Sequence, residues 1–509
     1  MGLSTQESVW EETKTMQSEV QNEATPDIPK EKFAFVHKGE RLTDTKLQTK
    51  PMGYFQDAMS RFVKNKGSVI CFGIIIMLFL YAFLAPIFSP YTISSRDAYY
   101  AYVSPKCNLF ARFGFWDGSK TMEVNKQTYE YMQNVPNAIL KDYGIKEHLV
   151  AKRVQKWHKI KIDTYAKVGW VKVLLTAEEY DEARSYEKET GTKLFYPVLD
   201  PEQIKNPTYK TDQNAWFLTD ERGNIQRDAA GKPKDIYVKD ASSPDGYAYY
   251  FSRMNGKQKE CRVMYSEWYK YKNGHYASFL FGTEISGYDI FTRLAHGARL
   301  SLVLSILVSA VNLCIGIVIG SLEGYYGGTF DLVMERIKEI LYDVPSILIF
   351  ALFQLFLASQ VGALPSMFVA FIFYGWISTS STVRAQFYRF KGQDYVNASR
   401  TLGASDFRLI FRHILPNAIG FIITSSVLVI PSVITNEATL TYLGVINLEG
   451  DKQTSVGTML EAAKSAMTTN PHALFFPAAF IALLLICFNE FGNGLRDAFN
   501  PTLRGAEDA

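Results

Sequence analysis

Residues 394–417 have the types and spacing of a protein-docking site. Small and weakly apolar side chains recur at i, i+3, i+4 and i+7, where a helix would place them on one face: Tyr395, Ala398, Ser399 and Leu402. Gly403 is expected to end that helix, because a residue without Cβ enters the left-handed conformation at little cost. Ser405 can then cap a second helix with Asp406 in its first turn, and Pro416 is expected to end the unit. Such a compact knob suits a groove on another protein, although an ordinary loop with a helical turn has the same pattern.

Motifs for hydrolytic or metal chemistry are absent from the sequence. It has no G-x-x-x-x-G-K-[ST] phosphate-binding loop, because Gly231 and Lys232 are followed by proline and lack the upstream glycine. The spacings H-E-x-x-H, G-x-S-x-G and paired C-x-x-C are absent as well. His148, His158 and His275 are isolated, which favours surface or core histidines over metal ligands. We therefore expect no enzymatic activity, and no metal or cofactor bound by this chain.

The elements that must hold residues 394–417 in place are apolar runs of membrane-spanning length. Six runs are expected to cross a bilayer, at 69–88, 300–322, 344–358, 364–378, 419–443 and 474–491. The first run starts too far from the N-terminus and is too long for a cleaved signal peptide, so we interpret it as a retained span. The third and fourth runs are short and contain prolines, so a buried hairpin is the alternative there.

Basic residues near the ends of the runs indicate one orientation. Arg61, Lys64 and Lys66 precede the first run, and six basic residues lie in or beside the docking segment: Arg384, Arg389, Lys391, Arg400, Arg408 and Arg412. Because basic residues favour the cytoplasmic side, both regions are expected there, as is the C-terminus with Arg496 and Arg504. Both termini of a multi-pass plasma-membrane protein are then cytoplasmic. The net charge of +3 is too small to indicate a nucleic-acid partner.

Residues 91–280 lie outside the cell membrane in this topology and have the composition of a folded domain. Five of the seven tryptophans fall in this part, which has no apolar run long enough to span a bilayer. Residues 176–179 form a capping box that opens a helix ending at Gly191. The runs 235–238, 247–252 and 261–271 are typical of strands. We expect an extracytoplasmic α+β domain inserted between the first and second spans.

Two of the five cysteines, Cys107 and Cys261, fall in this domain. They could form a disulfide, which would stabilise the domain by reducing the conformational freedom of the unfolded chain, or remain as two buried thiols. Cys71, Cys314 and Cys487 fall in apolar runs and are expected to be packing residues. The sequence leaves both alternatives open for the first pair.

Short motifs in the docking segment resemble a known family. Asn397-Ala398-Ser399, Gly403 and the run from His413 to Pro416 are similar to the EAA loop of bacterial ABC-importer permeases, the segment that docks on the ATPase subunit. Asn397 stands where that family usually has glutamate, and Ser399 replaces its second alanine. The resemblance implies a docking region made of these residues: Asp394, Tyr395, Asn397, Ala398, Ser399, Leu402, Gly403, Ala404, Asp406, His413 and Pro416.

Motifs on both sides extend the resemblance to the oligopeptide, dipeptide and nickel branch, and to its C-type (OppC-like) subunit. Residues 54–58 and 85–90 resemble the start of C-type permeases, and 281–302 and 324–336 resemble the entries to their second and third spans. The fold implied is a membrane all-α, type I ABC importer permease with six transmembrane helices and the inserted α+β domain. Its parts are a cytoplasmic tail and interfacial helix (1–66), a first span (67–90), the insertion (91–280) and a core of five spans (281–504) with the docking loop at 384–416. The family usually has a short connection where this insertion stands.

Glu437 is an acid in an apolar run, so it should face a partner, a cavity or the membrane boundary. The resemblance places it at the outer end of the fifth span, which makes Glu437 and Thr441 candidates for the translocation pathway or gate. The alternative for Glu437 is a charge at an interfacial helix end.

The resemblance implies a permease subunit of an ATP-driven importer, with oligopeptides as substrates. The partners implied are a homologous B-type permease, two ATPase subunits that bind ATP and Mg²⁺, an extracytoplasmic substrate-binding protein, the peptide and the lipid bilayer. Two hypotheses of other classes stay open: a membrane-anchored extracytoplasmic enzyme, and a sensory protein that kept the permease shell but lost transport.

Overall fold

The computed structural model describes residues 54–150, 153–204, 210–220, 222, 224–450 and 453–499. The chain divides into two compact units, 1–56 and 57–509, and everything below concerns the second unit and helix α2 at its start. The predicted mobile tail of about 50 residues lies outside the described residues, as does Arg504.

Helix α2 (Tyr54–Lys64) has the amphipathic pattern expected of an interfacial helix. Ala58 and Phe62 are buried, whereas Phe55, Met59 and Val63 form an exposed apolar stripe at intervals of four residues. Asn65 separates α2 from the next helix, because its side chain accepts a hydrogen bond from the backbone N–H of Ser68. The helix predicted here is therefore present and amphipathic, and its place at the membrane interface stays a prediction.

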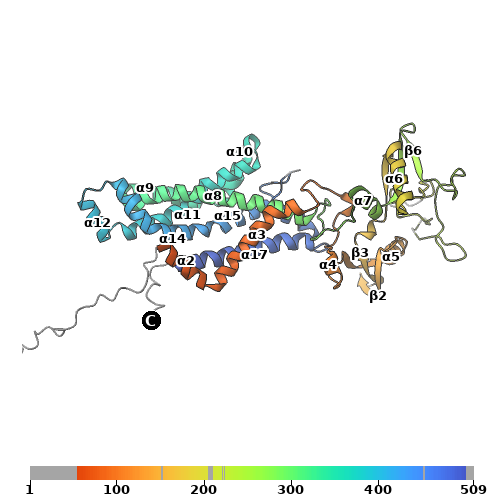
Figure 1. The fold of residues 1–509 in the computed structure, drawn as a ribbon, viewed down its shortest axis with the longest axis horizontal. Coiled ribbons are helices and arrows are strands. Elements are labelled where there is room, and N and C mark those ends of the chain that lie inside the picture. The colour runs from red at the N-terminus through yellow and green to blue at the C-terminus, as the bar shows by residue number, and fades with distance from the viewer. Residues whose placement is uncertain are drawn as a thin grey trace, which may run out of the picture. The chain divides into compact units, whose positions relative to one another are not determined.

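Within the described residues, five helical segments are long and apolar enough to cross a membrane. They are α3 (Lys66–Phe88), α8 (Ile290–Tyr326), α11 (Ala363–Phe390), the stretch Asp406–Tyr442 that contains α14 (Leu415–Val427) and α15 (Val429–Tyr442), and α17 (His472–Phe499). Figure 1 shows these helices running side by side. The predicted spans 69–88, 300–322, 364–378, 419–443 and 474–491 all fall within them.

The predicted third span is a bent pair of helices. Helix α9 (Gly328–Asp343) and helix α10 (Ser346–Val361) meet at an angle of 81°, and together they would make a sixth span. Helix α10 alone has 16 residues, which at 1.5 Å per residue is shorter than the hydrocarbon core of a bilayer. Pro345 lies at the bend, where its ring prevents the helix from continuing. The span predicted at 344–358 therefore overlaps α10 and belongs to this bent pair, and the described residues contain five candidate spans, or six if the pair counts as one.

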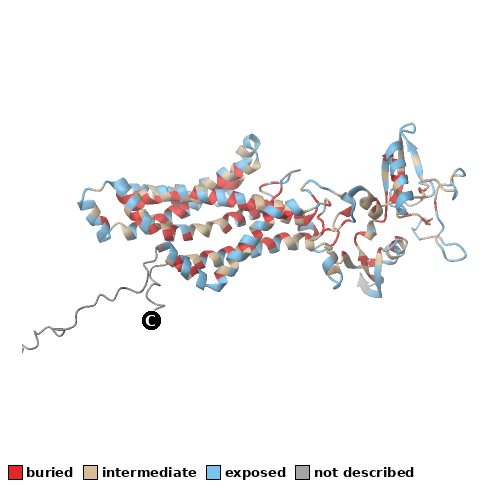
Figure 2. Cartoon of the chain, viewed as in Figure 1, coloured by how far each residue is buried: buried red, intermediate tan, exposed pale blue. Residues whose placement is uncertain are grey.

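Close helix packing explains the glycines of α8. Gly316, Gly320 and Gly324 recur every four residues on the face that meets α11. A Cβ at Gly316 would lie 2.6 Å from Cβ of Thr379, and a Cβ at Gly320 would overlap the backbone of Ser380. Small residues at this spacing let two membrane helices approach closely. Figure 2 shows buried residues along the inner faces of these helices.

Between α3 and α8 the chain forms two antiparallel sheets with short helices, which confirms the expected α+β character. One sheet has the order β1-β3-β2, and in the other β4 and β5 flank β7, with β6 also paired to β7. The strands are β1 (Ser119–Asn125), β2 (Ile139–Val150), β3 (Arg153–Asp163), β4 (Trp170–Thr176), β5 (Phe195–Tyr196), β6 (Tyr250–Arg253) and β7 (Gln258–Met264). The helices are η2 (Ala98–Tyr100), α4 (Asn108–Ala111), α5 (Lys126–Gln133), η3 (Ala166–Val168), α6 (Ala177–Thr190) and α7 (Tyr265–Asn273).

Local predictions in this part were partly right. Thr176 and Glu179 form the reciprocal capping box of α6, and Gly191 ends that helix at φ +69°. The strand predicted over 261–271 was wrong beyond Met264, where α7 begins. Tyr265 and Trp268 are buried three residues apart, so a helical rather than an alternating pattern faces the core. Residues 235–238 make isolated bridges instead of a strand.

All five cysteines are free thiols in the structure. For Cys107 and Cys261, it therefore has two thiols and not the disulfide. Cys107 lies at the N-cap of α4, whereas Cys261 is buried in β7 opposite Val173 of β4. Burial raises the pKa of the Cys261 thiol to about 12, which keeps it protonated and unreactive at neutral pH.

Candidate functional site

The predicted docking segment forms a helix, a glycine break and a second helical segment. The parts are α12 (Asp394–Thr401), α13 (Asp406–Arg408) and the π-helical turn η5 (Leu409–Ile414), which leads into α14. Gly403 has φ +83°, as predicted for the residue that ends α12. Its N–H donates to the carbonyl of Arg400 (3.0 Å) and the N–H of Ala404 to that of Ser399 (3.1 Å), which is the hydrogen-bond pattern of a Schellman motif.

Two details of the prediction were wrong. Ser405 occupies the N-cap position of α13, but its side chain makes no capping hydrogen bond. Asp406 in the first turn accepts a hydrogen bond from the Tyr325 hydroxyl of α8 (2.5 Å), so a tertiary contact holds this end. Pro416 does not end the unit, because it lies in the first turn of α14, where a missing N–H costs nothing, and η5 with His413 runs directly into that helix.

One side of the segment is buried against the membrane helices. Val396 of α12 is fully buried and packs in one cluster with Leu409 and Ile414 of η5 and with Val383 and Phe387 of α11. The aliphatic residue between Tyr395 and Asn397 therefore anchors the docking helix from below, whereas Tyr395, Ala398 and Leu402 of the predicted stripe lie on its exposed side. We refer to α12, α13 and η5 on this support as the knob.

The opposite side of the knob is exposed and apolar at its tip. Leu402 is 88% exposed and Phe407 is 72% exposed, and Tyr395, Ala398 and Asp394 are exposed beside them. Figure 2 shows the exposed surface of α12 at the end of the helices. Phe407 was missed by sequence reasoning, although a lone aromatic residue after the polar pair Ser405 and Asp406 was a signal. Large exposed apolar side chains on a rigid support mark a protein-interaction site.

The two residues that depart from the EAA pattern bond to their own backbone. The amide nitrogen of Asn397 donates to the carbonyl of Gly392 (3.3 Å), and the hydroxyl of Ser399 donates to the carbonyl of Tyr395 (2.8 Å). Neither presents a charge to the outside. The exposed apolar tip of the knob therefore consists of Leu402 and Phe407, and position 397 contributes no acid to it.

Buried charges fix the helices beneath the knob. The Lys338 ammonium of α9 donates to Glu323 of α8 at 2.9 Å, and both side chains are at most 4% exposed. Asp331 of α9 accepts hydrogen bonds from Arg384 and from the Tyr388 hydroxyl (2.7 Å) of α11. These contacts join α8, α9 and α11 at the end of the helices that holds the knob. Movement of the knob is therefore expected to move all three helices as one body.

Three carboxylates in this network lie close enough together to hold a metal ion. The oxygens of Glu323, Asp331 and Glu335 are within 4.8 Å of one another. Lys338 pairs with both Glu323 and Glu335, and Arg384 pairs with Asp331. Because two cations already pair with all three carboxylates, we interpret the cluster as an ion-pair network and not as a metal site.

Glu437 and Thr441 of α15, the predicted pathway residues, are both buried within this chain. The Ser301 hydroxyl of α8 donates to Glu437 (2.8 Å), and the Thr441 hydroxyl donates to the Glu437 carbonyl (2.9 Å). Helix α16 (Val456–Ala463) packs against both, since a Cβ at Gly457 would overlap Thr441. Neither side chain faces an open surface in this conformation, so the geometry gives their assignment to the pathway no support.

A cavity of about 550 Å³ lies elsewhere, between α8 and the first turns of α11. Its walls are apolar and include Val303, Leu307 and Phe368. Arg299 and His296 line its polar end, with 3.0 Å between the Arg299 guanidinium and Nδ1 of His296. The sequence analysis did not single out this site, although Arg299 stands directly before the apolar run at 300–322.

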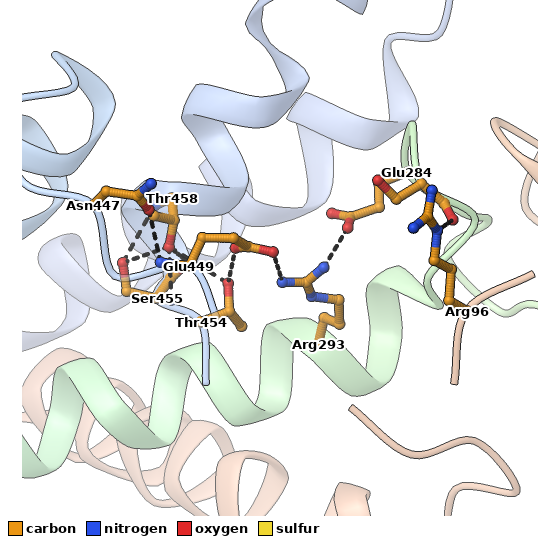
Figure 3. Close-up of polar contacts among 9 residues, drawn as sticks. Arg96, Glu284, Arg293, Asn447, Glu449, Thr454, Ser455 and Thr458 are labelled. Carbon is orange, nitrogen blue, oxygen red and sulfur yellow. Dashed lines mark hydrogen bonds and ion pairs between the residues drawn. The ribbon is translucent and has the colours of Figure 1, made fainter. Parts of the chain in front are cut away.

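A second polar network lies at the other end of α8 and is drawn in Figure 3. Arg293, only 2% exposed, bonds Glu284 at 2.5 Å and also pairs with Glu449, 156 residues further along the chain. Its guanidinium lies 4.3 Å from the ring centroid of Tyr288. Burial raises the pKa of Glu284, and the positive charge of Arg293 opposes that rise. The network ties the segment before α8 to the loop before α16.

Two family models match this chain. The model described as binding-protein-dependent transport system inner membrane component matches residues 312–505, and that of the N-terminal TM domain of oligopeptide transport permease C matches 53–105. Residues 106–311 lie between the two matches.

Curated relatives agree with these matches. The chain is 42% identical over 224 residues to the oligopeptide transport system permease protein OppC of Bacillus subtilis, covering 44% of this chain and 72% of the relative. It is 37% identical to DppC, the dipeptide permease of the same organism (45% and 70% covered), and 35% identical to OppC of Escherichia coli (45% and 73%). Among solved structures, a chain of the inward-facing MetNI methionine ABC transporter is 14% identical with a TM-score of 0.33, covering 40% of this chain and 94% of that chain.

Proposed function

Because this chain belongs to the family of binding-protein-dependent inner-membrane transport components, in its oligopeptide and dipeptide branch, we propose that it forms one half of the pore of an ATP-driven peptide importer. A homologous B-type permease forms the other half. Two ATPase subunits bind ATP and Mg²⁺, and an extracytoplasmic binding protein delivers the peptide. The termini of this chain lie in the cytoplasm, which is the side where basic residues gather.

The exposed tip of the knob is the observation that carries this proposal. Leu402 and Phe407 are two large apolar side chains without cover, on a segment anchored from below by Val396 and by the contact of Tyr325 with Asp406. A rigid support with an uncovered apolar tip suits insertion into a groove of the ATPase. ATP-driven closure of the ATPases would then move the knob as a lever, and the ion pairs beneath it would pass the motion to α8, α9 and α11.

Co-purification from a mild detergent tests the assembly. The tagged chain, isolated from its own membrane and analysed by mass spectrometry, is expected to retain ATPase subunits, a second permease and a binding protein. Recovery of the chain without any ATPase would contradict the importer and would favour the sensory hypothesis. The enzyme hypothesis receives no support from the relatives, since those named above are all transport permeases.

We also propose that the cavity between α8 and α11 is part of the peptide pathway. It combines apolar walls for side chains with a guanidinium at its polar end, and a peptide offers apolar side chains and a carboxylate. Residues 91–280 are proposed to receive the binding protein or to contact the partner permease.

Protection of an introduced cysteine by bound peptide tests whether the cavity belongs to the pathway. Val303 lines the cavity and Ile306 does not, yet their exposed fractions are 41% and 39%. In a background without the native cysteines, a thiol reagent should modify Val303→Cys more slowly when peptide and its binding protein are present. Ile306→Cys, the matched control, should react at an unchanged rate. Equal rates at both positions with and without peptide would exclude the cavity from the pathway.

A further inference from the structure

An exposed apolar and aromatic segment begins in α4 and continues beyond it, in the part of the chain between α3 and α8. Leu109, Phe113 and Phe115 are each more than half exposed, and Phe113 reaches 75%. The ring of Phe115 lies 5.6 Å from that of Phe110 and 6.5 Å from that of Phe113, so the apolar side chains form one continuous surface. We call residues 109–115 the aromatic loop. Neither family model matches these residues.

Contacts of the neighbouring Trp116 locate this loop at the end of a membrane helix. The Trp116 ring lies 6.1 Å from that of Phe476 and 6.3 Å from that of Phe281, which themselves stack at 4.1 Å. Phe476 is the fifth residue of α17, so it lies about 6 Å along a helix that rises 1.5 Å per residue. Trp116 is therefore level with the first turns of this candidate span.

Polar contacts hold the loop at this level. The Lys120 ammonium donates to the side-chain carbonyl of Asn470, just before α17, at 2.8 Å. The backbone N–H of Cys107 donates to the carbonyl of Trp116 (2.8 Å), which closes the loop at its base. Figure 1 shows α4 beside the end of α17, whereas the hairpin of β6 lies away from the helices.

A bilayer around α17 would place its polar boundary at the aromatic loop. Tryptophan is enriched at this boundary, and phenylalanine and leucine are the apolar residues that interfacial segments bury there. Phe475 in the first turn of α17 is also exposed, and Arg112 within the loop offers a positive charge to lipid phosphates. Both the apolar surface and the charge fit a lipid headgroup region.

We propose that the aromatic loop inserts into the lipid interface and anchors the part of the chain with the sheets to the membrane surface. The inference rests on α17 crossing the bilayer and is independent of which substrate the importer moves. The loop acts like a short interfacial anchor, with Leu109, Phe113 and Phe115 in the headgroup and acyl boundary.

Site-directed spin labelling in nanodiscs of phosphatidylcholine and phosphatidylglycerol tests the proposal. Single cysteines replace Phe113, Phe115 and, as the matched control, Met254, which is 71% exposed in the turn between β6 and β7. Labels at 113 and 115 should be reached by oxygen more than by a water-soluble nickel complex, at a depth of about 5–10 Å below the headgroup surface. The label at 254 should show the opposite preference.

Two outcomes would overturn the proposal. Labels at 113 and 115 with the nickel accessibility of position 254 would show that the loop lies in water. Labels shielded from both reagents only when the partner permease or binding protein is bound would show a protein interface instead of a lipid one. Because all three positions are exposed, a folding defect is not expected. An unchanged elution volume in size-exclusion chromatography checks this for each variant.

Discussion

A chain with Leu402→Glu and Phe407→Glu is expected to lose its ATPase during purification while keeping its fold. Both side chains are largely exposed, so replacing them removes little internal packing beyond the ring contact of Phe407 with Phe411. Buried apolar anchors of an interface cost about 2 kcal/mol or more when truncated. Two such losses amount to about a thousandfold in Kd, before any penalty for burying the new charges. The measurement is the ATPase recovered per permease after affinity purification.

Leu174→Glu on β4 is the matched control, because Leu174 is also a largely exposed leucine and lies in the part of the chain with the sheets. This variant should retain the ATPase fully. If the double variant at the knob still retains normal amounts of ATPase, the knob is not the docking site, even if the complete importer assembles. Loss of the ATPase in the Leu174 control as well would indicate general misfolding.

Replacement of Lys338 by methionine is expected to destabilise the chain strongly. The change leaves the carboxylate of Glu323, which is 0% exposed, without its cation. It also removes the positive charge that offsets the repulsion between Glu323 and Glu335. Breaking a buried ion pair from one side typically costs about 3–5 kcal/mol, because an uncompensated charge stays buried. Thermal unfolding in detergent, followed by size exclusion after heating, should show a clearly lower midpoint.

The double variant Glu323→Gln with Lys338→Met separates charge from packing. It removes both charges at similar side-chain volume, so most of the lost stability should return. If Lys338→Met alone melts like the unmodified chain, the network does not hold α8 and α9 together. If the double variant melts as low as the single one, the loss comes from packing and not from the unpaired acid.

Local features of the sequence were sufficient for much of the fold. Five of the six predicted apolar runs coincide with membrane-length helices, because crossing a bilayer requires only length and apolar composition, which are properties of one segment. Gly403 and Gly191 were identified as helix ends for a similar reason, since a positive φ is a local backbone state that glycine adopts without strain. The capping box at Thr176 depends on residues three positions apart, so it too could be predicted from the sequence.

Predictions that depended on the surroundings of a side chain were less successful. The stripe of Tyr395, Ala398 and Leu402 was predicted as one face of the docking helix, but Val396 was not identified as the residue that buries its other face. Helical spacing gives the faces of a short helix, but which face turns inward depends on the helices beneath it. The same limit explains Tyr265, where the strand-like composition gave way to α7 because the core accepts its helical face.

The sequence by itself determined the membrane-spanning segments, the break at Gly403 and the resemblance to permeases, because each depends on residues close together in the chain. The folded chain alone shows that Arg293 pairs with Glu449, that Ser301 of α8 donates to Glu437, and that the aromatic loop lies beside α17. These contacts join residues more than a hundred positions apart. No local pattern specifies such partners, since they are selected by the packing of whole helices, in which each buried charge or ring must find its neighbour.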